Sequence, residues 1–169
     1  MFAAGCGGSD SSSAGSTEAA TTGGEKTKVG FLYVGPKDDF GYNQAAYEGS
    51  EAMAAANPNV ELLQAENVPE TAEAERVMER MISQGAKLIF PTSFGHLTPA
   101  LNVAKKHPDV VFVHQGGLEP DPKGDNVGTY FGTVYEPVYL AGIAAAKATT
   151  SKKLGFNAVF LRSRSRERS

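Results

Sequence analysis

Residues 28–49 read Lys-Val-Gly-Phe-Leu-Tyr-Val-Gly-Pro-Lys-Asp-Asp-Phe-Gly-Tyr-Asn-Gln-Ala-Ala-Tyr-Glu-Gly. This stretch predicts a strand, a loop and a helix in that order, which is the repeating unit of an α/β fold. The residues from Val29 to Val34 form an almost unbroken apolar run, as a strand covered on both faces requires. The pair Gly35-Pro36 ends the strand, and Asn43 stands where it can cap the following helix.

The loop between this strand and this helix carries side chains suited to binding a small ligand. It contains Asp38, Asp39, Phe40, Tyr42 and Asn43. In an open parallel sheet, ligands bind beyond the carboxyl ends of the strands, where such a loop lies. An aromatic ring supplies a flat apolar wall, while a carboxylate and an amide supply directional hydrogen bonds. The adjacent carboxylates of Asp38 and Asp39 could also serve as metal ligands. More commonly, one carboxylate of such a pair caps the loop and the other is solvated, so we predict no metal site.

The chain continues with alternating strands and helices up to Thr150. Further strands are expected at 60–68, 87–92, 110–114, 126–132 and 153–161, and further helices at 71–84, 98–107 and 138–147. Thr98 is placed to cap the helix 98–107, with Pro99 in its first turn. In the helix 71–84, apolar residues recur with the spacing of a single buried stripe, and Gly85 is placed to end it. The alternation predicts an α/β fold in which a parallel sheet is sandwiched by helices, with right-handed crossovers.

Three loops of this predicted fold, 35–43, 92–97 and 115–118, gather at one edge of the sheet. The ligand-binding residues expected there are Asp39, Phe40, Tyr42, Asn43, Ser93, Phe94 and Gln115. Aromatic rings, amides, hydroxyls and carboxylates on one rim suit a small polar ligand with a flat ring. Aromatic loop residues also pack under neighbouring loops, so each ring retains a purely structural alternative.

The common catalytic and cofactor motifs are not found in the sequence. No Gly-x-Gly-x-x-Gly follows the first strand, and neither a phosphate-binding loop nor a Gly-x-Ser-x-Gly elbow occurs. The three histidines are not at metal-ligand spacing, so no metal or other cofactor is predicted. His96 beside Ser93 resembles a base and a nucleophile, but no acid is placed to orient the histidine. A net charge of −3 argues against nucleic acid as the main partner.

The first 27 residues read as an anchor and a tether. Residues 7–24 are almost entirely small and polar, and such a segment buries too little apolar surface to order itself. Cys6 is the single cysteine, which excludes an intrachain disulfide, and the small residues before it resemble a bacterial lipobox. Such a signal implies cleavage before Cys6 and lipid attachment to it, which places the protein on the outer face of the cytoplasmic membrane. The alternative is an ordinary thiol, because only five residues precede it where a basic and an apolar region are expected.

Short motifs across residues 28–156 match one family in their order. They are residues 34–36, 39–43, 47–49, 92–95, 103–110, 116–117, 130–132 and 139–142. Behind a lipobox-like cysteine, this set resembles the basic membrane protein family, whose members are substrate-binding lipoproteins of ABC importers and include purine-nucleoside receptors.

The resemblance implies a periplasmic-binding-protein fold of the first type, in which two lobes close on a solute and present it to permease subunits. By resemblance, the ring of Tyr42 stacks on a purine base and Asn43 hydrogen-bonds the ligand, while Asp39, Ser93 and Phe94 line the same cleft. Nucleoside-binding members commonly carry an aspartate where this chain has Gln115, which leaves the solute open within the family.

The expected organisation has three parts: the lipobox remnant and linker (1–27), the first α/β lobe (28–150), and a hinge-crossing strand with an Arg/Ser-rich tail (151–169). Composition switches abruptly after Phe156, which suggests truncation before a second lobe more than an RNA-binding tail. A single lobe offers half a cleft, so we expect weak ligand binding and self-association through the exposed cleft face. The alternatives are an α/β enzyme acting on nucleosides, a regulator, or a non-functional remnant.

Overall fold

The computed structural model describes residues 26–117 and 124–157. Cys6, the predicted tether and the Arg/Ser-rich tail lie outside these residues. In chain order the elements are β1 (Thr27–Leu32), α1 (Tyr42–Ala56), β2 (Val60–Ala65), α2 (Ala72–Ser83), β3 (Ala86–Pro91), the short 3-10 helix η1 (Phe94–His96), α3 (Leu97–Ala104), β4 (Val111–Gln115), β5 (Val127–Tyr130) and α4 (Tyr135–Ala148).

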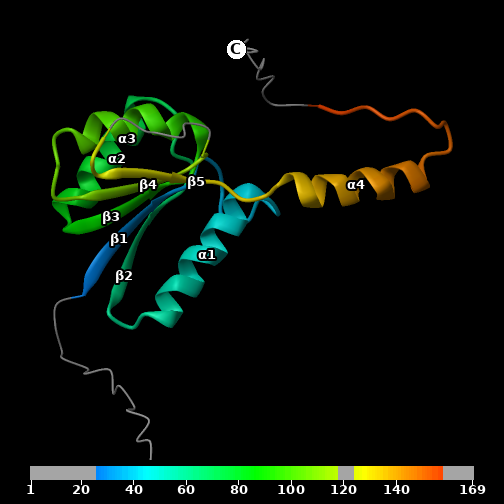
Figure 1. Ribbon diagram of the computed structural model, residues 1–169. Helices are drawn as coiled ribbons and strands as arrows, with labels where there is room; N and C mark the ends of the chain where they lie inside the picture. The colour runs from blue at the N-terminus through cyan, green and yellow to red at the C-terminus, as the bar shows by residue number, and fades with distance from the viewer. Residues whose placement is uncertain (1–25, 118–123, 158–169) are drawn as a thin grey trace, which may run out of the picture.

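The strands form one parallel sheet in the order β2-β1-β3-β4-β5 (Figure 1). The helices α2 and α3 lie on one side of this sheet and α1 on the other. The predicted class, a parallel sheet flanked by helices on both faces, is confirmed.

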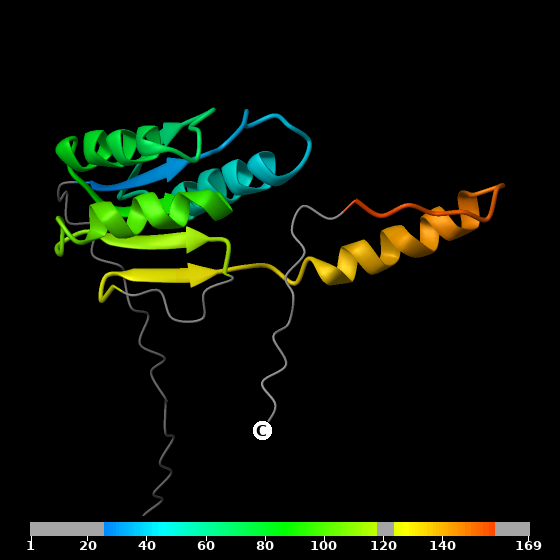
Figure 2. The same cartoon turned by 90° about the horizontal axis from the view of Figure 1, so that it is seen from above.

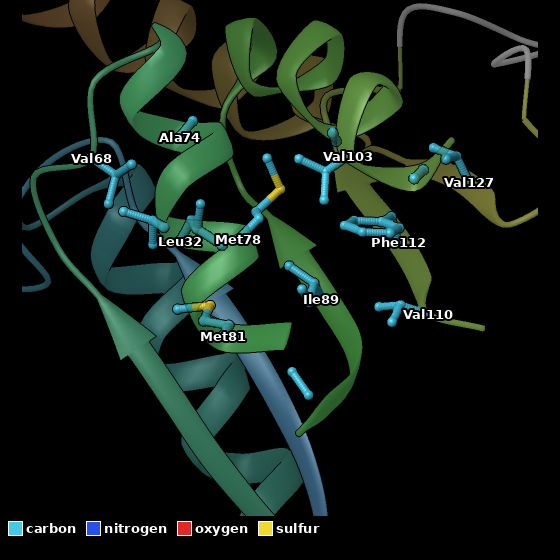
Figure 3. Packing of buried hydrophobic residues seen from close by; sticks show 14 residues of the cluster. Leu32, Val68, Ala74, Met78, Met81, Ile89, Val103, Val110, Phe112 and Val127 are labelled. Atoms are coloured by element: carbon cyan, nitrogen blue, oxygen red, sulfur yellow. The ribbon is translucent and has the colours of Figure 1, made fainter. Parts of the chain in front are cut away.

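The core divides between the two faces because side chains of a strand alternate in direction. On β1 and just beyond it, Leu32 belongs to the cluster under α2 and α3, whereas Val29, Phe31 and Tyr33 pack toward α1. Figure 3 shows the larger cluster, in which Met78 and Met81 from α2 face the sheet residues Ile89 and Phe112. These methionines are therefore packing residues, as their helical spacing predicts.

The helix α2 begins and ends as its sequence predicts. The hydroxyl of Thr71 accepts a hydrogen bond from the amide of Glu73 at 3.3 Å, which satisfies one free donor of the first turn. Gly85 has φ +97°, a backbone conformation that a side chain disfavours, so glycine at this position allows the chain to leave the helix.

Two predicted helix caps are wrong. Asn43 lies inside α1. The N-cap of this helix is Gly41, which has no side chain to accept a hydrogen bond from the first turn. The carboxylate of Asp39 takes over that task, because it reaches the amides at the helix start. Thr98 does not cap α3, because η1 runs directly into it and the helix already begins at Leu97.

The last described segment departs from the sheet. α4 begins at Tyr135, three residues before the predicted start, and every one of its residues is exposed. Figures 1 and 2 show it projecting away from the strands. The sixth strand expected at 153–161 is wrong for residues 153–157, which belong to no strand, and the remainder lies outside the described residues. Among the helices that the structure describes, none has the length and apolar character needed to cross a bilayer.

Candidate functional site

The loop between β1 and α1 is held by the carboxylate of Asp39. Its Oδ1 accepts from the amides of Gly41 (2.9 Å) and Gln44 (3.0 Å), and its Oδ2 accepts from the amide (3.1 Å) and the side chain (2.8 Å) of Asn43. These bonds, led by the one from the Gln44 amide, lower the pKa of Asp39 from 3.8 to about 2. Asp39 thus acts as the loop cap and stays ionised, while its neighbour Asp38 is exposed to solvent.

The predicted ligand residue Asn43 is buried and turned toward its own loop. Only 7% of its surface is exposed, its Oδ1 accepts from the amide of Gly35 at 3.2 Å, and its Nδ2 donates to Asp39. The side chain therefore ties the end of β1 to the start of α1. This contact fixes where the aromatic residues between them stand.

Phe40 is the most exposed large apolar residue at this edge, with 94% of its surface accessible. Its φ of +53° is a left-handed conformation that a bulky residue rarely adopts. The amide of Phe40 donates to Oε1 of Gln44 at 3.1 Å, which supports this conformation from the first turn of α1. Strain of this kind is concentrated at ligand-binding and switch regions.

Tyr42 connects the first loop to the end of β4. Its hydroxyl donates to the main-chain oxygen of Gln115 at 3.2 Å, and the hydroxyl of Tyr130 donates to the side-chain oxygen Oε1 of Gln115 at 2.9 Å. Partial burial raises the pKa of both tyrosines. Tyr42 as a whole remains 39% exposed, so the residue is anchored through its hydroxyl and still accessible from solvent.

We call the polar edge formed by the loops 35–43, 92–97 and 115–117, together with Glu70 and Tyr130, the rim. Ser93 and Glu70 form one part of it. The Ser93 hydroxyl, which is nearly buried, donates to Oε1 of Glu70 at 2.5 Å, and the amide of Gly95 donates to the same oxygen at 2.8 Å. The hydrogen bond from Ser93 is the main cause of the lowered pKa of Glu70. A Cβ on Gly95 would lie 2.5 Å from Cδ of Glu70, so only glycine permits this approach. Phe94, between the two donors, is 41% exposed.

Two buried histidines form hydrogen bonds with main-chain carbonyls of the loops that make up the rim. His96 pairs through Nε2 with the Val68 carbonyl at 3.0 Å, and His114 pairs through Nε2 with the Ser93 carbonyl at 2.8 Å. A carbonyl only accepts, so both Nε2 atoms carry the proton. Burial lowers the pKa of each ring, and neither Nδ1 has a hydrogen-bond partner among the described residues. Since the Ser93 hydroxyl bonds Glu70, the pairing of a serine nucleophile with a histidine base is not formed.

The predicted gathering of the loops 35–43, 92–97 and 115–117 at one edge is therefore correct. Glu70 and Tyr130 belong to the same rim, although neither is among the residues that the sequence predicts to bind a ligand. A signal for Glu70 exists, because it follows β2 at the carboxyl edge of the sheet, where the other loops lie. In residues 26–117 and 124–157, no three metal-ligating side chains come together.

An open groove of about 420 Å³ runs beside the rim, between α1 and the sheet. Its lining is mainly apolar and includes Phe31, Ala46, Met53 and Phe90. Gln115 and Tyr130 belong to both the groove and the rim. The polar groups gather on the rim, which makes the rim, and not the groove, the candidate site for a small polar ligand.

Comparison with known proteins covers most of the chain. Residues 26–165 match the family model described as ABC transporter substrate-binding protein PnrA-like. The purine-binding protein BAB2_0673 of Brucella abortus is 43% identical over 133 residues, which cover 78% of this chain and 37% of that protein. The putative ABC transporter glucose-binding protein TsgA13 of Haloferax volcanii is 32% identical over 81% of this chain and 34% of its own length.

Solved structures agree on the fold. An ABC transporter solute-binding protein from Aeropyrum pernix superposes with a TM-score of 0.58 at 24% identity, over 73% of this chain and 35% of that chain. The chain thus spans about a third of the length of the relatives that it matches.

Proposed function

Because this chain belongs to the family of PnrA-like ABC transporter substrate-binding proteins, we propose that residues 28–150 form the first lobe of a receptor for a nucleoside or a related purine. The solute is held against the rim of this lobe and covered by a second lobe. Residues 1–27 serve as anchor and tether, and residues 151–169 begin the crossing between lobes. The name of the Brucella relative supports a purine.

The observation that carries this proposal is the placement of Tyr42. The residue is 39% exposed, and its hydroxyl is hydrogen-bonded to the main-chain oxygen of Gln115. A ring held in this way loses little freedom when a flat ligand stacks on it. Stacking of a base on an aromatic side chain contributes roughly 1–3 kcal/mol. Phe40 and Phe94 add accessible rings on neighbouring loops, and the side chain of Gln115 offers polar groups at the same rim.

The proposed setting is the outer face of a bacterial cytoplasmic membrane. Lipid on Cys6 holds the protein there, and permease subunits of an ABC importer receive the solute. The lipobox-like sequence before a polar tether supports the anchor. The role is transport without catalysis, since Ser93 and His96 are each engaged with other groups.

The test is a titration of the ¹⁵N-labelled chain with adenosine and, separately, with glucose, followed by NMR. One lobe buries only part of a ligand, so we expect affinity on the order of 1 mM, which NMR detects. Adenosine should shift the amides of residues 40–44 and 93–95, and glucose should leave them unchanged. Shifts with glucose alone would overturn the purine assignment, and release of free adenine during the titration would overturn the non-catalytic one.

A pair of variants at Tyr42 tests the stacking. Tyr42→Ala should weaken adenosine binding at least about tenfold, the equivalent of a lost stacking contact. Tyr42→Phe keeps the ring and should bind within about threefold of the original chain. Equal binding by Tyr42→Ala would show that the ring does not contact the base.

Self-association through the exposed cleft face is part of the same proposal. Phe40 is the residue that most favours it, because its apolar ring is almost wholly exposed. Sedimentation at increasing concentration should show dimers, and Phe40→Ser should reduce them. Dimerisation that is unchanged in Phe40→Ser would locate the contact elsewhere.

A further inference from the structure

Glu70 occupies the rim of the candidate site without a role in the proposed stacking. It lies in the loop between β2 and α2, at the edge where the loops after β1, β3 and β4 also meet. We propose that Glu70 selects the solute by accepting a hydrogen bond from an N–H group of the ligand. This inference rests on the proposed function, and it specifies which purines the site prefers.

The two oxygens of the Glu70 carboxylate are used unequally. Oε1 accepts both bonds from protein donors, from the Ser93 hydroxyl and the Gly95 amide. Oε2 has no hydrogen-bond partner in the part of the chain that the structure describes. A carboxylate oxygen accepts about two hydrogen bonds, so the accepting capacity of Oε2 remains for a ligand.

The carboxylate is held in place before any ligand arrives. Ser93 is 7% exposed, and its carbonyl is bonded in turn by the buried ring of His114 at 2.8 Å. Gly95 admits Glu70 because a Cβ there would lie 2.6 Å from Oε2. A pre-oriented acceptor forms a hydrogen bond with little loss of side-chain freedom.

The negative charge of the rim determines which groups of a ligand Glu70 can bind. The bonds to Oε1 lower its pKa, so the carboxylate is ionised at neutral pH. Asp38 and Asp39 add negative charge to the same edge, and Lys37, in the same loop as both, pairs with Glu66 at 3.4 Å. An anionic acceptor favours N–H donors and disfavours a phosphate or a carboxylate on the ligand.

Glu70 shares an edge of the sheet with the ring on which the base would stack. Tyr42 follows β1 and Glu70 follows β2, and these two strands are parallel neighbours, so both residues lie beyond the carboxyl ends of adjacent strands. In the proposed complex, a base stacked on Tyr42 turns one edge toward the carboxylate. An exocyclic amino group on that edge satisfies Oε2, whereas a base without a donor leaves it unpaired.

Adenosine and purine riboside test this inference. They share the sugar and both rings, but only adenosine carries the exocyclic amino group. Glu70→Gln keeps an oxygen for Ser93 and Gly95 and replaces the free oxygen by an amide nitrogen, which donates and does not accept. Asp38→Asn is the matched control, because it removes one negative charge from an exposed position on the same edge.

In the original chain, adenosine should bind about tenfold more tightly than purine riboside, the usual size of a charge-assisted hydrogen bond. Glu70→Gln should abolish that difference by weakening adenosine alone, and Asp38→Asn should preserve it. The amide resonance of Gly95 gives a second readout that needs no variant, because this amide bonds the same carboxylate. Adenosine should shift it and purine riboside should not.

Equal affinities of the two ligands in the original chain would overturn the role of Glu70, and so would an unchanged preference in Glu70→Gln. In both cases, weaker binding by Tyr42→Ala would leave the proposed function standing. Absence of any shift with either ligand would overturn both proposals together.

Discussion

The hydroxyl of Tyr42 donates a hydrogen bond to the main-chain oxygen of Gln115, at 3.2 Å, across 73 positions of sequence. The contact joins the loop after β1 to the end of β4, two strands away in the sheet. It fixes the hydroxyl end of a side chain that is still 39% exposed. Loops of the rim are therefore joined by hydrogen bonds, and the Tyr42 side chain is held at its hydroxyl without a ligand.

Tyr42→Phe removes this bond and retains the ring. We expect the free energy of unfolding to fall by about 1 kcal/mol, the usual net contribution of one hydrogen bond. Urea denaturation followed by circular dichroism measures the change. Tyr139→Phe in α4 is the control, because Tyr139 is 70% exposed, and it should change stability by less than about 0.5 kcal/mol. Equal effects of the two variants would mean that the Gln115 contact contributes nothing.

Phe112→Ala tests the core under α2 and α3. The ring has no exposed surface and packs in the larger cluster, so its removal leaves a cavity and should cost about 3–5 kcal/mol. Val111→Ala, at the preceding position of the same strand, removes a side chain that is 48% exposed and should cost less than about 1 kcal/mol. The same urea denaturation compares them. Similar losses would contradict the packing of Phe112 in the core, because Val111 is half-exposed and Phe112 is fully buried.

Asp39 should make the first loop sensitive to strong acid. Its pKa is about 2 in the folded chain and 3.8 without its partners, so the folded state binds the proton less readily. The stability that Asp39 contributes is therefore complete above pH 3.8 and is lost as the pH falls toward 2. Carboxyl chemical shifts of Asp39, followed by ¹³C NMR between pH 5 and 1.5, measure the pKa directly.

Asp39→Asn is the matching control for stability. This substitution keeps the size of the side chain and removes its titration. The loss of folding stability between pH 3.8 and 2 should therefore be smaller than in the original chain. A midpoint for Asp39 near 4 would show that its four hydrogen bonds do not persist in solution.

The buried histidines predict a second loss of stability at milder acidity. Burial lowers the pKa of His96 and His114 below 6.5, because protonation would place a charge and an unpaired Nδ1 donor in the interior. The folded state thus resists protons that the unfolded chain takes up. Stability should be complete above pH 6.5 and fall as the pH decreases through the folded pKa values.

Urea denaturation at pH 7 and pH 5 measures this effect. His114→Gln retains an N–H donor for the Ser93 carbonyl and cannot become charged, so it should lose less stability between the two pH values. An equal loss in His114→Gln and the original chain would exclude His114 as a source of the pH dependence.

Local patterns in the sequence determined the architecture. Alternating apolar runs and helical stripes act over a few residues, and each dictates its own element almost independently of distant partners. For this reason the strands around Val29, Ile89 and Phe112, the stripe of α2 and the stop at Gly85 were predictable. The meeting of three loops at one edge followed from parallel strands alone, because all their carboxyl ends point the same way.

The tertiary structure decided which side chain does what on that edge. Asp39, and not Asn43, caps α1, because the turn at Phe40 brings its carboxylate to the helix start. Glu70 reaches Ser93 across 23 positions, and Tyr130 reaches Gln115 across 15. Hydrogen bonds of this kind depend on ångström-scale placement of loops from separate strands. Sequence patterns specify the strands but not that placement, because it arises only when the sheet has assembled and its loops have packed together.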